Sequence, residues 1–177
     1  MKNSKLEDNL NKLFSNSGYK MVDVSDKSVT HRKALATGEI VLSAEIIKLI
    51  KEKKMPKGDP LSIAEVSGIN GVKKTSELIP LCHPLPLDHI SLHTEINDKK
   101  NSIVVYCLVS ANSKTGVEME ALSGVSSALL AIYDLSKIVE PNLKISNTKL
   151  LVKAGGKKGL WTNPDGVPEK IKNILKL

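Results

Sequence analysis

Apolar residues recur every three or four positions in two stretches of the first half of the chain, and this period predicts helices. The first stretch is Ile40, Ala44, Ile47 and Ile50. Glu39 would lie in its first turn, where a negative charge is favourable. The second stretch, expected to share one face, is Ile63, Val66, Ile69 and Val72. Asp59 and Pro60 precede it as an N-cap and a proline at the first helical position, and the helix ends before Pro80.

Alternation of apolar and polar residues predicts strands elsewhere. One or two extended segments are expected before the first helix, over residues 19–24 and 29–36. After the second helix, Ile90, Leu92 and Ile96 alternate with polar residues, so one face of this strand is polar. A turn at 97–101 leads to residues 102–110, which are apolar on both faces as in a central strand.

The second half of the chain predicts a long helix from about Gly116 to Val139, closed by Pro141, and a final strand at 143–152. The resulting β-α-β-β-α-β order, with an extra inserted helix, predicts an α+β fold, a ferredoxin-like sandwich with an antiparallel sheet. The expected organisation is a polar N-terminal tail, one domain and a C-terminal tail, at residues 1–17, 18–160 and 161–177.

The charge balance of the 177 residues is basic, with a net charge of +7 and a pI near 9.3. Excess lysine and arginine attract anions: nucleic acid, an acidic membrane or a phosphorylated small molecule. Aromatic residues make up only 3% of the chain, too few for the stacking on which single-stranded nucleic acid binders rely. The sequence shows no basic amphipathic stretch with bulky apolar residues of the kind that binds a membrane surface. The charge therefore favours a small phosphate-bearing ligand, although solubility alone would also account for it.

Cysteine usage and hydropathy indicate a cytoplasmic protein. Cys82 and Cys107 form neither a disulfide framework nor a metal-binding spacing. No apolar run is long enough to cross a bilayer, and the N-terminal residues lack the apolar segment of a secretory signal. His89 and His93 face the same way on a predicted strand without a zinc-binding pattern, so no metal site is predicted.

Chemistry is indicated first by residues 78–85, where Pro80 and Pro84 bracket Cys82 and His83. Two prolines leave this segment few conformations, which suits either an aimed imidazole or a stiff connector with a buried histidine. A second indication is residues 153–159, whose glycines and lysines suit phosphate binding but also a solvated tail.

The long helix offers acidic candidates at both ends. Thr115 and Glu118 have the spacing of a capping box, and Glu120 is left as a candidate site carboxylate or a solvated glutamate. Asp134 and Lys137 are three apart and can form either an acid–base pair or a surface ion pair.

Glu120 and Asp134 are fourteen positions apart and therefore about 21 Å apart along the helix. They serve either the two ends of a long ligand or one site completed by a second subunit. Small residues between them, including Gly124, predict close packing against another element, which could cross a subunit boundary.

Long runs of the chain resemble the cyclic pyranopterin monophosphate synthase family, the C proteins of molybdenum cofactor biosynthesis. The matching runs are 21–25, 57–59, 78–85, 114–122, 132–134 with Lys137, and 150–151 with Lys153 and 155–157. The resemblance implies a lyase that converts (8S)-3′,8-cyclo-7,8-dihydroguanosine 5′-triphosphate to cyclic pyranopterin monophosphate and diphosphate. It also implies a ferredoxin-like subunit in a hexamer, a trimer of dimers, with the active site at the dimer interface.

Residue by residue, the resemblance implies a catalytic set of Asp134, Lys137 and Lys57. The implied substrate-binding set is Leu81, Cys82, His83, Met119, Glu120, Glu118, Arg32, Lys73 and Lys153. The sequence shows no cofactor requirement, and a role for a divalent cation such as Mg²⁺ is left open. A basic ferredoxin-like RNA-binding module is the alternative function, since RNA-recognition domains share this topology, but the aromatic residues that such domains use are missing.

Overall fold

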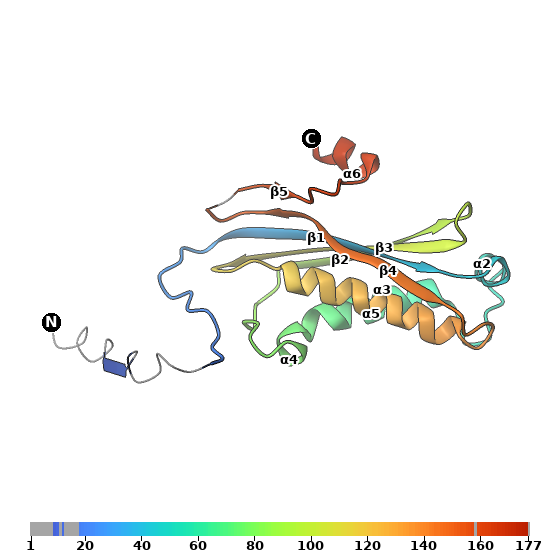
Figure 1. The fold of residues 1–177 in the computed structure, drawn as a ribbon, viewed down its shortest axis with the longest axis horizontal. Helices are drawn as coiled ribbons and strands as arrows, with labels where there is room; N and C mark the ends of the chain where they lie inside the picture. The colour runs from blue at the N-terminus through green and yellow to red at the C-terminus, as the bar shows by residue number, and fades with distance from the viewer. Residues whose placement is uncertain (1–8, 11, 13–17, 158, 177) are drawn as a thin grey trace.

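The computed structural model describes residues 9, 10, 12, 18–157 and 159–176. In this part of the chain five strands form one antiparallel sheet in the order β2-β3-β1-β4-β5 (Figure 1). The strands are β1 (Thr30–Val41), β2 (His89–Asn97), β3 (Ser102–Ser113), β4 (Lys144–Ala154) and β5 (Trp161–Thr162). The helices are α2 (Ala44–Lys51), α3 (Pro60–Lys73), α4 (Thr75–Leu78), α5 (Glu118–Ser136) and α6 (Glu169–Leu175).

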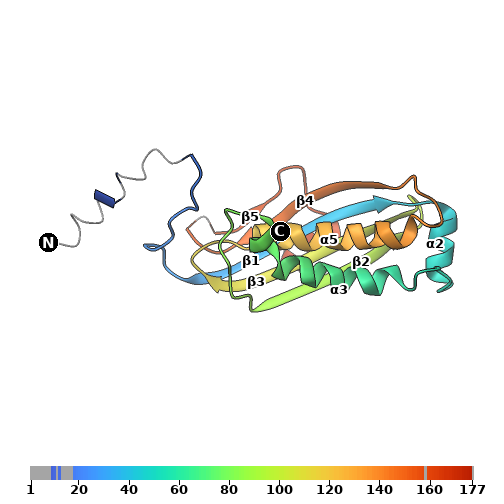
Figure 2. The same cartoon turned by 90° about the horizontal axis from the view of Figure 1, so that it is seen from below.

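Helices α3 and α5 lie side by side on one face of the sheet (Figure 2). The element order β1-α3-β2-β3-α5-β4 is the ferredoxin-like βαββαβ order, and α2 is the extra helix inserted after β1. The predicted α+β fold with an antiparallel sheet is therefore confirmed.

The start of the first helix was predicted wrongly. Glu39 and Ile40 lie in β1, where Ile40 is fully buried opposite Ile103 of β3. The helix begins only at Ala44, after an N-cap at Ser43 whose hydroxyl accepts a hydrogen bond from the Ile46 amide at 3.3 Å. Ile40 is four positions before Ala44, a spacing that fits a helix, but Ile40 is buried as part of a strand. Apolar spacing over so few residues does not distinguish a strand end from a helix start, which explains the error.

Helix α3 begins as predicted, with Asp59 as its N-cap, but of the four apolar residues expected to share one face only Val72 is buried. Ile63 and Val66 are 45% and 59% exposed. The buried positions are Pro60, Ala64, Gly68, Gly71 and Val72. Small residues permit closer approach of two backbones, so α3 turns this stripe toward α5 rather than its larger side chains.

The contact of α5 with its neighbours is as close as the small residues predicted. A Cβ atom on Gly124 would lie 2.6 Å from both the Cys107 sulfur on β3 and a Val72 methyl group on α3. A Cβ atom on Gly71 would lie 2.1 Å from the Ser127 hydroxyl oxygen. These contacts lie within one chain, so the small residues seat α5 on its own sheet and on α3.

The opposite face of the sheet is partly covered by the segment that follows β4 (Figure 1). Strand β5 pairs with β4, and the sheet therefore continues beyond residue 160, where the sequence placed the start of a C-terminal tail. Val167 and Ile171 then pack in a second apolar cluster with Leu151 and Tyr106. The expected N-terminal tail, 1–17, falls almost wholly outside the described residues.

The replacement Gly124→Leu should destabilise the protein by about 1–3 kcal/mol, because a core with no free volume at this position must distort to accept the new side chain. Urea denaturation followed by circular dichroism measures the free energy of unfolding. Gly18→Leu is the matched control, since nothing lies within 4 Å of the Cβ position at Gly18. Equal stability of the two variants would contradict the close packing described here.

Candidate active site

Helix α5 carries candidate site residues at both of its ends. Asp134 lies near its C-terminus, and Lys137 is its C-cap. Glu118 and Glu120 lie in its first turn. The two groups are separated by most of the length of a helix of 19 residues, so each end forms a separate site within one chain.

At the C-terminal end, Lys57, Asp134 and Lys137 form what we call the lysine–aspartate cluster. Lys137 Nζ lies 2.8 Å from Asp134 Oδ1, and Lys57 Nζ lies 3.1 Å from Asp134 Oδ2. Lys57, in the loop between α2 and α3, also donates a hydrogen bond to the backbone oxygen of Asp134 at 3.3 Å. One carboxylate therefore holds two ammonium groups.

The lysine–aspartate cluster is open to solvent, and the Asp134 side chain is 51% exposed. Hydrogen bonds from Lys137 and then Lys57 lower the pKa of Asp134. The hydrogen bond to Asp134 raises the pKa of Lys137. Asp134 and Lys137 are therefore both charged near neutral pH, and an exposed ion pair of this kind adds little to stability.

At the other end of α5 lies a cavity of about 580 Å³, which we call the α5 N-terminal cavity. Its walls come from four separate segments, namely residues 22–27, 81–85, 115–120 and 150–153. The predicted site residues on its walls are Leu81, Cys82, His83, Glu118, Met119, Glu120 and Lys153. The stiff segment between Pro80 and Pro84 thus places its Cys-His pair beside the first turn of α5.

Glu118 pairs with Lys153 of β4, with 3.1 Å between Lys153 Nζ and Glu118 Oε1. The predicted capping box is wrong, because the N-cap of α5 is Val117 and makes no side-chain cap. Glu118 curls back instead over Gly116, where a Cβ atom would lie only 1.8 Å from its carboxylate. The absent side chain at Gly116 therefore lets Glu118 reach the lysine.

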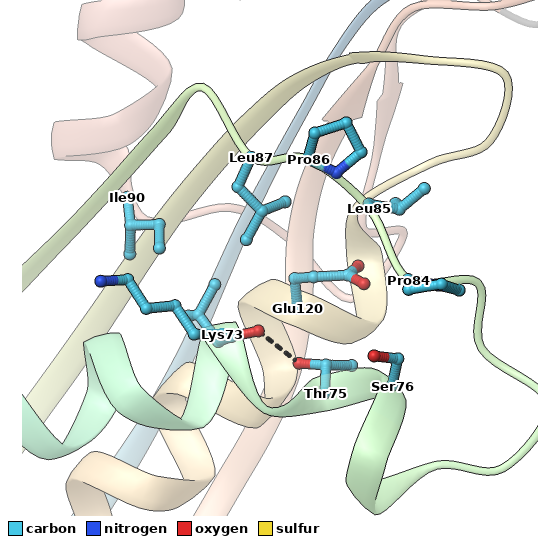
Figure 3. Close-up of a pocket in the computed structure, with 10 residues that line it drawn as sticks. Lys73, Thr75, Ser76, Pro84, Leu85, Pro86, Leu87, Ile90 and Glu120 are labelled. Atoms are coloured by element: carbon cyan, nitrogen blue, oxygen red, sulfur yellow. Dashed lines mark hydrogen bonds between the residues drawn. The ribbon is translucent and has the colours of Figure 1, made fainter.

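Glu120 is only 5% exposed, and among the described residues no lysine, arginine or histidine forms an ion pair with it. Burial, and then the charge of Glu118, raises the pKa of Glu120. Figure 3 shows its carboxylate beside Pro84 and Leu85 in a neighbouring cavity of about 420 Å³. A buried carboxyl group with a raised pKa is a candidate proton carrier.

Cys82 is not activated as a nucleophile. Burial, and then the nearby Glu120 charge, raises the pKa of its thiol. A thiol that stays protonated at neutral pH is a weak nucleophile. Cys82 therefore contributes to the wall of the cavity rather than to covalent chemistry.

Arg32 lies next to the α5 N-terminal cavity rather than in it. Its guanidinium donates long hydrogen bonds, both 3.4 Å, to the backbone oxygens of Ser113 and Lys114. Arg32 lines two further cavities that share Gly116 with the first one. A Cβ atom on Gly156 would lie 1.9 Å from the guanidinium, so this glycine lets the backbone pass over Arg32.

Lys73 lines the 420 Å³ cavity with Glu120, but its ammonium points away from that carboxylate (Figure 3). The structure therefore gathers most of the predicted substrate-binding residues around the N-terminus of α5. It places Lys73 at their margin and leaves the lysine–aspartate cluster at the far end of the helix.

Three basic or aromatic residues of this region were not singled out from the sequence as site residues. Lys27 lines the α5 N-terminal cavity. Lys114 lies beside it and donates a hydrogen bond to the Ser25 backbone oxygen at 2.7 Å. The third is Trp161, and the distance from its ring centroid to Lys153 Nζ is 5.8 Å. In the sequence, Trp161 stands out only by its place two residues after the glycine- and lysine-rich run.

Among the described residues, no group of three or more His, Cys, Asp or Glu side chains is arranged to hold a metal ion. No helix in the same part of the chain has the length and apolar character needed to span a membrane.

The structure is that of an α+β protein with a ferredoxin-like sheet, a cavity lined in part by Lys27 and Lys153, and a separate lysine–aspartate cluster. The MoaC family model matches residues 21–156. The chain belongs to the MoaC family.

Curated relatives agree with this assignment. A protein of Chloroflexus aurantiacus is 46% identical over 145 residues, which are 82% of this chain and 89% of the relative. A protein of Thermomicrobium roseum is 43% identical over 82% of this chain and 88% of its own length, and one of Cereibacter sphaeroides is 48% identical over 78% and 87%. Each of the three is named cyclic pyranopterin monophosphate synthase.

The replacement Glu120→Gln should stabilise the protein at pH 8, and the gain should shrink as the pH falls toward 4.5. Folding raises the pKa of Glu120 above its ordinary value of 4.5. At higher pH the ionised carboxylate therefore destabilises the folded state. At low pH Glu120 is protonated in both the folded and the unfolded state, and it then has no effect on stability. Melting temperatures across this pH range test the prediction. Glu65→Gln on α3 is the control; the same pH-dependent gain in the control would contradict the assignment to Glu120.

Proposed function

We propose that this chain is a cyclic pyranopterin monophosphate synthase, a phosphorus–oxygen lyase of molybdenum cofactor biosynthesis. Its substrate would be the cyclised guanosine triphosphate, and its products cyclic pyranopterin monophosphate and diphosphate. The observation that carries the proposal is the 46% identity over 145 residues to a relative of that name, in an alignment that spans most of both chains. The charged side chains of the cavity and of the lysine–aspartate cluster would act on the substrate.

The cations near the N-terminus of α5 would bind the triphosphate. Lys27 and Lys153 line the α5 N-terminal cavity, and Arg32, Lys114 and Lys157 line the adjoining cavity of about 640 Å³. Positive groups fixed in place stabilise the charge that develops as diphosphate leaves. Lys73, at the margin, would extend the same field.

The lysine–aspartate cluster would move protons as the purine-derived ring opens and the pyranopterin closes. Lys137 is held protonated by Asp134 in the free protein and would act first as a donor. Lys57 shares the same carboxylate and would be an auxiliary donor, as would His83 in the cavity.

Asp134 and Glu120 lie about 21 Å apart on one helix, so one small reacting centre cannot touch both within a single chain. We infer that a partner protomer brings its cavity to the lysine–aspartate cluster, in a dimer that assembles further into a hexamer. Exposed apolar side chains flank the cluster: Leu130, one turn before Asp134, is 61% exposed, and Ile138, directly after Lys137, is 57% exposed. Such a surface suits burial against another protomer.

A divalent cation such as Mg²⁺ would arrive with the triphosphate, since Mg²⁺ in proteins is commonly held by substrate phosphates. The two free cysteines suit a reducing compartment such as the cytoplasm. The RNA-binding alternative is not supported by the relatives, whose names are those of enzymes.

Incubation of the purified protein with the cyclised guanosine triphosphate should release diphosphate, measured by a coupled phosphate assay. Lys137→Ala should lower turnover by about 10²–10⁴-fold, the range for loss of a general acid or base, while the substrate still binds. Calorimetric titration with a non-reactive substrate analogue measures that binding.

Lys172→Ala is the matched control, because Lys172 and Glu169 form an exposed pair with the same three-residue spacing. Its turnover should equal that of the original chain. Unchanged turnover in Lys137→Ala would remove Lys137 from the mechanism, and no diphosphate from the original chain would end the proposed function.

Complementation tests the shared site. Lys137→Ala and Lys153→Ala should each be inactive alone. After joint refolding of the two variants, about half of the two-fold dimers are mixed, and each mixed dimer holds one intact site of two. The mixture should therefore regain about one quarter of the original turnover. Pairs of Lys137→Ala with Lys57→Ala, both in one cluster, are the control and should stay inactive. Full inactivity of the first mixture, despite mixed dimers seen by native mass spectrometry, would place the whole site in one chain.

A further inference from the structure

Trp161 is the one tryptophan of the chain, and it stands directly opposite Lys153 in the antiparallel β4–β5 pair. Residues opposite one another in such a pair project from the same face of the sheet. Lys153 is opposite Ala34 of β1, which belongs to the same buried cluster as Val125 and Leu129 of α5, so this face is the one covered by the helices. The Lys153 ammonium lies 5.8 Å from the centroid of the indole ring, within the range of a cation–π contact.

Lys153 therefore has two partners of different kinds. The Glu118 carboxylate, 3.1 Å away, orients the ammonium but also balances its positive charge. The ring of Trp161 attracts the same ammonium without carrying a net negative charge. An incoming phosphate that replaces Glu118 at the ammonium therefore leaves the second contact intact.

We propose that Trp161 is a positioning residue for Lys153, which keeps the ammonium at the α5 N-terminal cavity while an anion takes the place of Glu118. The inference rests on the proposed function for the identity of the substrate. The binding step itself requires only a diphosphate group. The segment after the family match, 157–177, thereby takes part in the site through its first strand.

Calorimetric titration with inorganic diphosphate tests the proposal. Trp161→Leu and Trp161→Met, which lack an aromatic ring, should weaken binding by about two- to fivefold, the range expected for one half-exposed cation–π contact. Trp161→Phe keeps a ring and should bind within about twofold of the original chain. Lys149→Met is the control, because Lys149 lies on the same strand opposite Thr37 and outside the residues that line the cavity.

Fluorescence of the original chain provides a second measurement that needs no change at Trp161. Diphosphate should alter the emission of this single tryptophan in a saturable manner, and Lys153→Met should abolish the change while Lys149→Met keeps it. In turnover assays Trp161→Leu should raise KM and leave kcat unchanged, the signature of lost binding rather than lost chemistry.

Equal diphosphate affinity in the original chain and in both ringless variants would overturn the inference, as would a Trp161→Phe variant as weak as Trp161→Leu. These results are independent of turnover. Diphosphate binding that depends on the ring, in a chain that does not convert the cyclised nucleotide, would support the role of Trp161 and reject the proposed function.

Discussion

The close packing of α5 against β3 and α3 is the constraint on which the rest of the structure depends. Gly124 leaves no space for a side chain between the helix, Cys107 and Val72. Because α5 is fixed at its middle, both of its ends are fixed as well, and each end holds functional groups at a defined place. Asp134 is carried by α5, whereas Lys57 belongs to the loop between α2 and α3, so their ion pair depends on where the helix lies.

The two ends of α5 differ in their electrostatics. At the C-terminal end, one carboxylate is shared by two ammonium groups, and the surplus charge is positive. At the N-terminal end, Glu118 is paired with Lys153, whereas Glu120 is buried and has no ion-pair partner among the described residues. The first arrangement favours charged groups that exchange partners, and the second favours a carboxyl group that holds a proton. On the proposed function, these two ends of α5, contributed by two protomers, would face one ligand.

Local signals in the sequence predicted most of the fold. Asp59 followed by Pro60 marked the start of α3, and the alternation of Ile90, Leu92 and Ile96 gave β2 its polar face. These features depend on residues a few positions apart, so sequence contains them directly. The exposure of Ile63 and Val66 was not predictable in this way, because it depends on which stripe of α3 fits most closely against α5.

In the candidate site, too, contacts between nearby residues could be predicted from the sequence, and contacts between distant segments could not. Asp134 and Lys137 are three residues apart on a helix, and their ion pair follows from spacing alone. The contacts of Lys57 with Asp134 and of Lys153 with Glu118 join distant segments, and only the fold brings them together. Trp161 reaches Lys153 through the pairing of a two-residue strand, too short to stand out in any periodic pattern.

Exposure of the lysine–aspartate cluster links its chemistry to assembly. In a single chain the cluster is half open to water, and at physiological salt its field is screened within about 8 Å. Coverage by a partner protomer would remove that water and strengthen each interaction among Lys57, Asp134 and Lys137, since charges interact more strongly at lower dielectric. The same step would bring the cavity of the partner within reach. On the proposed function, a lone protomer therefore holds every catalytic group and yet remains inactive, because neither its geometry nor its dielectric environment is complete.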